Sequence, residues 1–230
     1  MRSILAALIC LICTAAFANE PLLTNYPPLR NVGNLGPVVT DIESHLPAGH
    51  PYRDNDRITW THEGSHGIAG QLRNKCRQSG FYLLGNRAVL MHEPATTLSA
   101  VAAAVPLSLR GQVYRLYLVE GQRYWQNQPT YVFDEWVAYA NGSEARQQLG
   151  IRDRAETVEY TLEFIPYSLC VAKASRSQDP QMKAFIRWHI ERCLTFGNVN
   201  RLRTASDAEA LRQFTRTYLG AEWTKKTLGF

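Results

Sequence analysis

The sequence predicts one helix-rich α+β domain with a small sheet or hairpin. The chain has 230 residues, of which 45% are hydrophobic and 20% charged, and this composition suits a single globular domain. Several long segments carry apolar residues at helical spacing, whereas two short apolar runs on either side of Gly85-Asn86 have the pattern of a β-hairpin. No internal repeat is present, which excludes a repeat array.

The first 18 residues have the composition of a secretory signal peptide. A short basic start precedes an apolar stretch at 4–14, and Ala16 and Ala18 are the small residues that signal peptidase reads. The stretch is shorter than the roughly 20 residues needed to span a bilayer, and no later segment is long and uncharged enough to do so. We therefore expect cleavage after Ala18, a secreted or periplasmic protein and no stable membrane insertion.

Residues 19–56 are predicted to form a Pro-rich, irregular N-terminal arm. They hold six of the eleven prolines and show no sustained period of a helix or a strand. His45 and His50 lie in this arm, where exposure to solvent is the default. Residues 57–230 are expected to form the domain itself.

A helix is predicted at 57–77, because apolar residues and both histidines of its first half share one face. Asp54-Asn55-Asp56 offers an N-cap, which explains these aspartates more simply than a calcium site does. Strands at 81–84 and 88–91 would form the hairpin.

The later elements follow from the same kinds of pattern. Small residues predict a helix at 95–105 that ends at Pro106. Alternating apolar and polar residues predict a half-buried strand at 112–119. The residues at 121–129 are predicted to form a polar loop. Helical spacing and capping residues predict four more helices: 130–149, 152–174 with Pro166 inside it, 180–196 after Asp179, and 206–219 after the capping box Ser206-x-x-Glu209.

Three cysteines, Cys76, Cys170 and Cys193, remain after the predicted signal peptide. In an oxidising compartment an odd count leaves either one disulfide and a free thiol or no disulfide. A Cys170–Cys193 disulfide between consecutive helices is the expected pairing, and the alternative is that all three are small buried residues.

The charge pattern argues against a nucleic-acid partner. The formal net charge is +5, but the basic residues do not form the dense blocks of a dedicated nucleic-acid-binding protein.

The predicted helix at 57–77 contains His62, Glu63 and His66 in the arrangement H-E-x-x-H. Two imidazoles four residues apart lie on one helix face, so both can bind one zinc ion. Glu63 is then placed to take a proton from zinc-activated water and to deliver it to the leaving nitrogen of a peptide bond. Gly64 and Gly67 weaken the helix but would let a substrate or a second backbone approach closely.

This motif resembles the active-site helix of the zincin metallopeptidases, and the resemblance covers this helix and one later helix. A zincin needs a third protein ligand. The metzincin pattern would require Gly at position 69 and His at position 72, where this chain has Ala69 and Leu72, so that clan is excluded.

A gluzincin-like resemblance implies that the third ligand is Glu135, within 133–139. Asp134, as in aspzincins, is the next candidate, and the remaining candidates are Glu144, His92 and Glu93.

Zinc peptidases use a Tyr or His near the metal as an extra donor to the tetrahedral intermediate. Tyr131, one turn before Glu135, and Tyr139, one turn after it, are the candidates. A Tyr shortly before the Glu is similar to the arrangement in lethal-factor-like toxin peptidases.

Together these features predict a zincin-like domain in which the helix of His62 faces the helix of Glu135 across a zinc ion. The expected function is that of a secreted zinc-dependent metallopeptidase acting on peptides or proteins, and an edge of the hairpin or of the 113–119 strand would align the substrate. The alternative is an exported zinc-binding or surface-interaction protein on the same scaffold, without turnover.

Overall fold

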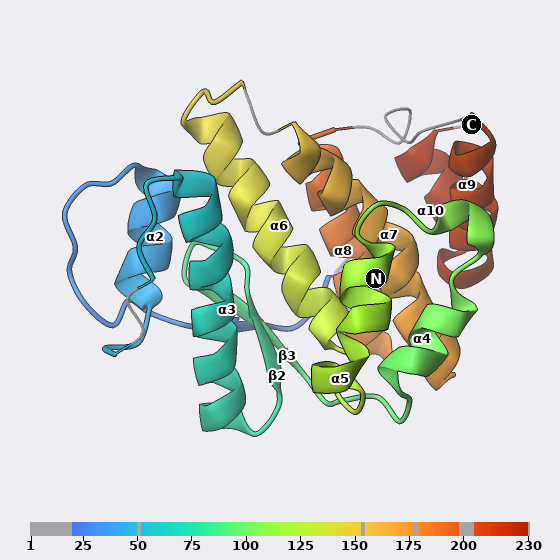
Figure 1. Ribbon diagram of the computed structural model, residues 1–230, viewed down its shortest axis with the longest axis horizontal. Coiled ribbons are helices and arrows are strands. Elements are labelled where there is room, and N and C mark those ends of the chain that lie inside the picture. Colours follow the sequence, from blue (N-terminus) through green and yellow to red (C-terminus); the bar gives the residue numbers. More distant parts are fainter. Residues whose placement is uncertain (1–19, 50–51, 153–154, 177–178, 198–204, 230) are drawn as a thin grey trace, which may run out of the picture.

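The computed structural model describes residues 20–49, 52–152, 155–176, 179–197 and 205–229, of which 205–207 are described by their backbone alone. Most of these residues are helical, and one small antiparallel sheet lies behind two long helices in the view of Figure 1. The predicted α+β class is therefore confirmed at this level. The signal peptide predicted at 1–18 lies outside the described residues.

The sheet has three strands in the order β1-β3-β2. Strands β2 (Ser79–Tyr82) and β3 (Arg87–Met91) form the predicted hairpin, and their turn passes through Gly85 and Asn86, both with positive φ. The third strand, β1 (Leu23–Asn25), pairs with β3 and was not predicted.

The two long helices α3 (Arg57–Cys76) and α6 (Tyr131–Gln148) lie side by side and run in opposite directions (Figure 1). Both were predicted nearly to their ends. The side chain of Asp56 caps α3 by accepting a hydrogen bond from the backbone N–H of Ile58, which confirms the predicted cap.

The interpretation of residues 19–56 as an irregular arm is wrong for β1 and for α2 (Pro37–His45). Helix α2 was missed because it is short and begins at a proline, although a proline in the first turn leaves no hydrogen bond unmade. His45 was expected to be exposed but is fully buried. His50 lies outside the described residues.

Helix α2 packs directly on α3 at Gly64. A Cβ atom added to Gly64 would lie 2.4 Å from Cγ2 of Ile42 on α2, so the contact needs glycine. This glycine therefore admits a second helix, which explains its presence inside a helix despite its poor propensity.

The segment after β3 contains α4 (Leu98–Ala104), which confirms the predicted helix in a shorter form. The predicted strand at 112–119 is wrong, because this segment forms a π-helix, η2 (Arg115–Glu120). Its inward-facing residues follow helical spacing, whereas the apolar residues that suggested alternation include Leu116, which is 53% exposed. A short helix, α5 (Gln122–Trp125), lies within the predicted polar loop.

The last part of the chain is helical, as predicted. It comprises α7 (Glu156–Ser175), α8 (Pro180–Leu194), α9 (Ala205–Leu219) and α10 (Ala221–Leu228). Asp179 caps α8, and Pro166 lies inside α7. Helix α10 was not predicted, and the Ser206 side chain of the proposed capping box lies outside the described side chains.

The predicted Cys170–Cys193 disulfide is wrong, since both thiols are free. Each is buried in the main apolar core, and burial raises both thiol pKa values to about 12. The alternative, small buried residues, holds for these two but not for Cys76, which is exposed.

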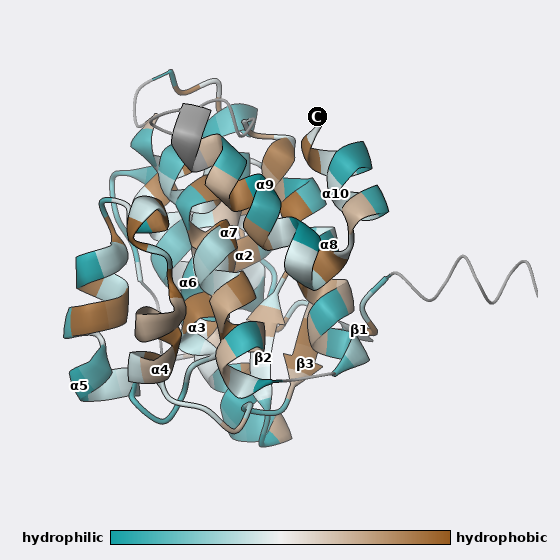
Figure 2. Cartoon of the chain, turned by 90° about the vertical axis from the view of Figure 1, so that its right-hand side faces the viewer, coloured by the Kyte–Doolittle hydropathy of each residue, from teal (hydrophilic) through white to brown (hydrophobic). Residues whose placement is uncertain are grey.

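Figure 2 shows polar and apolar residues mixed along the helices, as expected of helices that bury one face in a core. Within the described ranges, no helix combines the length and the apolar character that crossing a membrane requires.

Candidate metal centre

The centre begins on α3, where the four-residue spacing of His62 and His66 places both imidazoles on one helix face. The two Nε2 atoms lie 3.1 Å apart. Both side chains are largely buried, with exposed fractions of 14% for His62 and 22% for His66. The motif therefore aims two nitrogen donors at one point.

Glu135 faces these imidazoles from α6. Its Oε2 atom lies 3.5 Å from Nε2 of His62 and 3.5 Å from Nε2 of His66. This oxygen is buried and forms no hydrogen bond within the described part of the chain. A buried carboxylate oxygen without a donor is costly, so its position indicates that something else satisfies it.

The three donor atoms have the spacing that a metal ion imposes. A tetrahedral ion with ligand bonds of about 2.0–2.2 Å holds its ligand atoms about 3.3–3.6 Å apart. The measured separations of 3.1, 3.5 and 3.5 Å are close to these values. The group formed by His62, His66 and Glu135 could therefore hold a metal ion.

Asp134, the alternative third ligand, contacts the other nitrogen of the same ring. Its Oδ2 atom lies 3.2 Å from Nδ1 of His66, on the side of the imidazole away from Glu135. A carboxylate in this position fixes the ring and makes Nε2 a better ligand. The adjacent residues Asp134 and Glu135 on α6 thus lie near opposite ring nitrogens of His66.

The charges at the centre are strongly coupled. Burial alone would raise the pKa of Glu135, but the neighbouring His66 and His62 hold it well below its usual range. Burial would lower the pKa of His66, yet Asp134 and Glu135 raise it well above its usual range. A metal ion bound here would compete with protons for these ligand atoms.

Three tyrosines surround Glu135: Tyr117, Tyr131 and Tyr139. Burial, together with the negative charge of Glu135, raises the pKa of each, to about 12 for Tyr139. All three therefore remain protonated donors at neutral pH. The hydroxyl groups of Tyr117 and Tyr139 lie 2.6 Å apart, and the ring of Tyr139 packs at 4.5 Å from that of His62.

Glu63 borders a small cleft beside His62. The cleft has a volume of about 170 Å³, and its other lining residues include Tyr117 and Tyr139. Tyr131 lies outside the cleft lining and stacks on Trp125, with ring centroids 4.8 Å apart. The structure therefore brings Glu63 and Tyr139 to the same cleft but leaves Tyr131 outside its lining.

The remaining candidate ligands have other partners. Glu144 forms an ion pair with Arg192 at 2.7 Å, and His92 lies 2.8 Å from the amide nitrogen of Gln78. Glu93 accepts a hydrogen bond from the Ser79 hydroxyl group.

Tyr117 was not singled out in the sequence, because it lies in the segment that was misread as a strand. No local motif marks it, and its side chain reaches the centre from η2 through contacts with Tyr131 and Tyr139 on α6. The 113–119 segment is also unable to serve as a strand edge for a substrate, so the corresponding wall of the cleft is helical.

Comparisons of this chain with protein families, with curated proteins and with solved structures found no match.

Proposed function

We propose that the protein is a secreted or periplasmic zinc-dependent metallopeptidase with a zincin-like, gluzincin-type centre, and that His62, His66 and Glu135 bind the zinc ion. The observation that carries this proposal is the convergence of three donor atoms at ligand-like separations, beside a cleft that Glu63 lines.

The donor set favours zinc. Two imidazoles and one carboxylate suit a borderline metal ion, and three protein ligands leave the fourth tetrahedral position open, as in catalytic zinc sites. A zinc ion bound here supplies Lewis acidity, which activates water near neutral pH and polarises the carbonyl group of a peptide.

Glu63 acts as the general base in this proposal. It directly follows His62 on α3 and borders the cleft in which a peptide bond would lie. Its carboxylate takes a proton from water and delivers it to the leaving nitrogen, because the same group can serve both steps.

Tyr139 supplies a hydrogen bond to the oxyanion that develops during the reaction. Its raised pKa keeps the hydroxyl protonated, and Tyr117 orients that hydroxyl at 2.6 Å. Tyr131, which lies outside the cleft lining, supports the position of Glu135.

The experiment is a comparison of wild-type protein with Glu63→Gln. A mixed peptide library is incubated with each zinc-loaded protein, and the cleavage products are identified by mass spectrometry. We expect Glu63→Gln to keep its zinc and to lose activity by about 10²–10⁴-fold, since the general base is removed. Glu159→Gln, an exposed carboxylate on α7, is the matched control and should cleave like the wild type.

The alternative, a zinc-binding or surface-interaction protein without turnover, is favoured by the small volume of the cleft. It predicts that wild-type protein binds zinc and cleaves nothing in the library. Equal cleavage by wild type and Glu63→Gln would contradict the assigned role of Glu63.

A further inference from the structure

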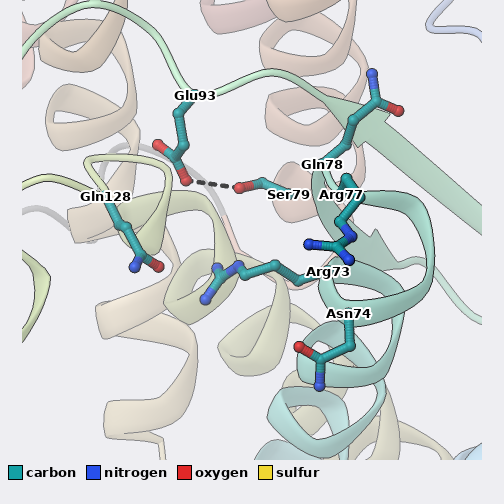
Figure 3. Close-up of a pocket in the computed structure, with 7 residues that line it drawn as sticks. All are labelled: Arg73, Asn74, Arg77, Gln78, Ser79, Glu93 and Gln128. Carbon is teal, nitrogen blue, oxygen red and sulfur yellow. Dashed lines mark hydrogen bonds between the residues drawn. The ribbon is translucent and has the colours of Figure 1, made fainter.

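A second and larger pocket opens at the C-terminal end of α3 (Figure 3). Its volume is about 580 Å³, within the range of small-molecule and peptide subsites. Arg73 reaches it from α3, Arg77 from the position directly after α3, Gln128 from the segment before α6, and Glu93 from the segment after β3. The side chains of Arg73, Gln128 and Glu93 point toward one another (Figure 3).

The two arginines bring positive charge to a pocket that the carboxylate of Glu93 also lines. Neither Arg73 nor Arg77 forms an ion pair with a described carboxylate. The Nε atom of Arg73 and the Oε1 atom of Gln128 are both buried without a hydrogen-bond partner among the described residues. A buried guanidinium N–H without an acceptor indicates that a ligand supplies one.

Glu93 lines the same pocket, but its carboxylate is already occupied. The hydroxyl group of Ser79 donates to Oε1 at 2.6 Å, and Thr130 donates to both carboxylate oxygens through its hydroxyl and backbone N–H groups. Thr130 precedes the first turn of α6, where a negative charge is stabilised. Glu93 therefore has Ser79 and Thr130 rather than the arginines as its hydrogen-bond partners, and the two positive charges of Arg73 and Arg77 exceed its single negative charge in the pocket.

The pocket and the metal centre share one wall. Arg73 follows His66 by seven residues, which is nearly two helical turns, so it lies on the same face of α3 about 10.5 Å farther along the axis. The guanidinium group of Arg73 lies over the ring of Trp125 at 5.7 Å, and Trp125 stacks on Tyr131, one turn before Glu135.

We propose that Arg73 and Arg77 bind a carboxylate group of the peptide substrate. An extended peptide advances about 3.3–3.6 Å per residue, so this carboxylate lies about three residues from the bond at the metal centre. It is either the C-terminal carboxylate of the peptide or the side chain of an Asp or Glu. A guanidinium group matches both, because its parallel N–H groups fit the two carboxylate oxygens.

This inference rests on the proposed peptidase function for its position in the substrate, but binding at the pocket is measured without catalysis. Three acetylated probes are titrated into the full chain by calorimetry: Ac-Ala-Ala-Ala-Ala with a free C-terminus, the same peptide as an amide, and Ac-Ala-Ala-Asp-Ala amide. The titrations use metal-free wild type and zinc-loaded Glu63→Gln.

We expect at least one of the two carboxylate-bearing probes to bind in both forms of the protein, and the amide without a carboxylate not to bind. The probe that binds identifies whether the C-terminus or an acidic side chain is recognised. Arg73→Gln should weaken binding about tenfold or more, since hydrogen bonds to a charged group are lost. Arg77→Gln, at an exposed position, should change binding in the same direction.

Lys75→Gln is the matched control, because Lys75 is an exposed cation on the same turn that does not line the pocket. Equal binding of the acid and the amide, equal weakening by Lys75→Gln and Arg73→Gln, or no binding of either carboxylate probe would overturn the proposal. Carboxylate-dependent binding without any cleavage by zinc-loaded wild type would refute the peptidase function and leave the pocket assignment standing.

Discussion

Two clusters in this protein place imidazoles beside carboxylates. In the cluster of His45, Nδ1 lies 2.6 Å from the carbonyl oxygen and 3.2 Å from the carboxylate of Asp41, and Nε2 lies 3.0 Å from Oδ1 of Asn86. The hydroxyl group of Tyr82 also lies within 3.1 Å of both ring nitrogens. In the cluster of His62 and His66, two Nε2 atoms and Oε2 of Glu135 face each other instead, and no described residue donates a hydrogen bond to the oxygen.

The difference separates a structural histidine from a candidate ligand. Both clusters contain imidazole and carboxylate groups, but His45 is fully buried, whereas His62 and His66 are partly exposed. The polar atoms around His45 have partners that complete a hydrogen-bond network, which ties α2 to the hairpin turn. At the α3–α6 contact the two Nε2 atoms and Oε2 of Glu135 converge, the oxygen has no hydrogen-bond partner among the described residues, and this group could hold a cation.

The largest expected effect is the loss of zinc on changing the second cluster. His66→Gln should abolish stoichiometric zinc binding and peptide cleavage, because two protein ligands remain. His45→Gln should keep one zinc ion per chain, although the loss of buried hydrogen bonds should lower the free energy of unfolding by about 1–3 kcal/mol. Zinc content after gel filtration and urea unfolding measure the two effects.

The distinction between the two clusters is wrong if His66→Gln and His45→Gln have the same effect on zinc binding. Zinc retained by His66→Gln, or lost from a folded His45→Gln protein, would show that convergence and missing partners do not distinguish these histidines.

A smaller effect is expected at Asp134. Asp134→Asn removes the charge that orients His66 but leaves all three ligands in place, so zinc affinity should fall about 10–100-fold. Competition with a fluorescent zinc chelator measures this change. If Asp134 were the third ligand, Asp134→Asn would lose zinc altogether and Glu135→Gln would retain it.

The smallest effect is a pH dependence of stability at the first cluster. Asp41 has a lowered pKa: burial alone would raise it, but His45, Gly85 and Tyr82 donate hydrogen bonds that lower it. The contribution of Asp41 to the free energy of unfolding is therefore present above its unfolded-state pKa of about 3.9, and it is lost as the pH falls through the folded-state pKa.

His45 has a raised pKa, because Asp41 outweighs the opposing effect of burial. The contribution of His45 to the free energy of unfolding is present below its unfolded-state pKa of about 6.5, and it is lost as the pH rises through the folded-state pKa.

Both contributions are therefore complete between about pH 4 and pH 6.5. The difference in unfolding free energy between wild type and His45→Gln, each saturated with zinc, should be largest in this window and should shrink above it. Urea unfolding at a series of pH values measures the difference, and a constant difference would contradict the pairing of His45 with Asp41.

The sequence predicted those parts of the fold that local pattern determines. The long helices α3 and α6 repeat apolar residues over many turns, and the Gly85-Asn86 turn marks the hairpin. The π-helix η2 was missed because its apolar residues alternate as they do in a strand. Which of its side chains point into the core depends on packing against other helices. Helix α2 was missed because it takes its stability from contacts with α3 rather than from its own short sequence.

The candidate site also has parts that the sequence predicted and parts that it did not. The pairing of His62 with His66 follows from helical spacing, and the proximity of Glu135 was inferred from a family resemblance. The contact of Asp134 with Nδ1 of His66 and the approach of Tyr117 could not be predicted from the sequence. The first depends on how α6 packs on α3, and the second on where η2 places the Tyr117 side chain beside Tyr139.

The most direct test of the metal centre is the zinc content of the wild-type chain beside that of Glu135→Gln. Each protein is incubated with excess zinc, freed of unbound metal by gel filtration and analysed by inductively coupled plasma mass spectrometry. The proposed centre predicts one zinc ion per wild-type chain and none in Glu135→Gln. A wild-type chain without zinc, or equal zinc content in both proteins, would contradict it.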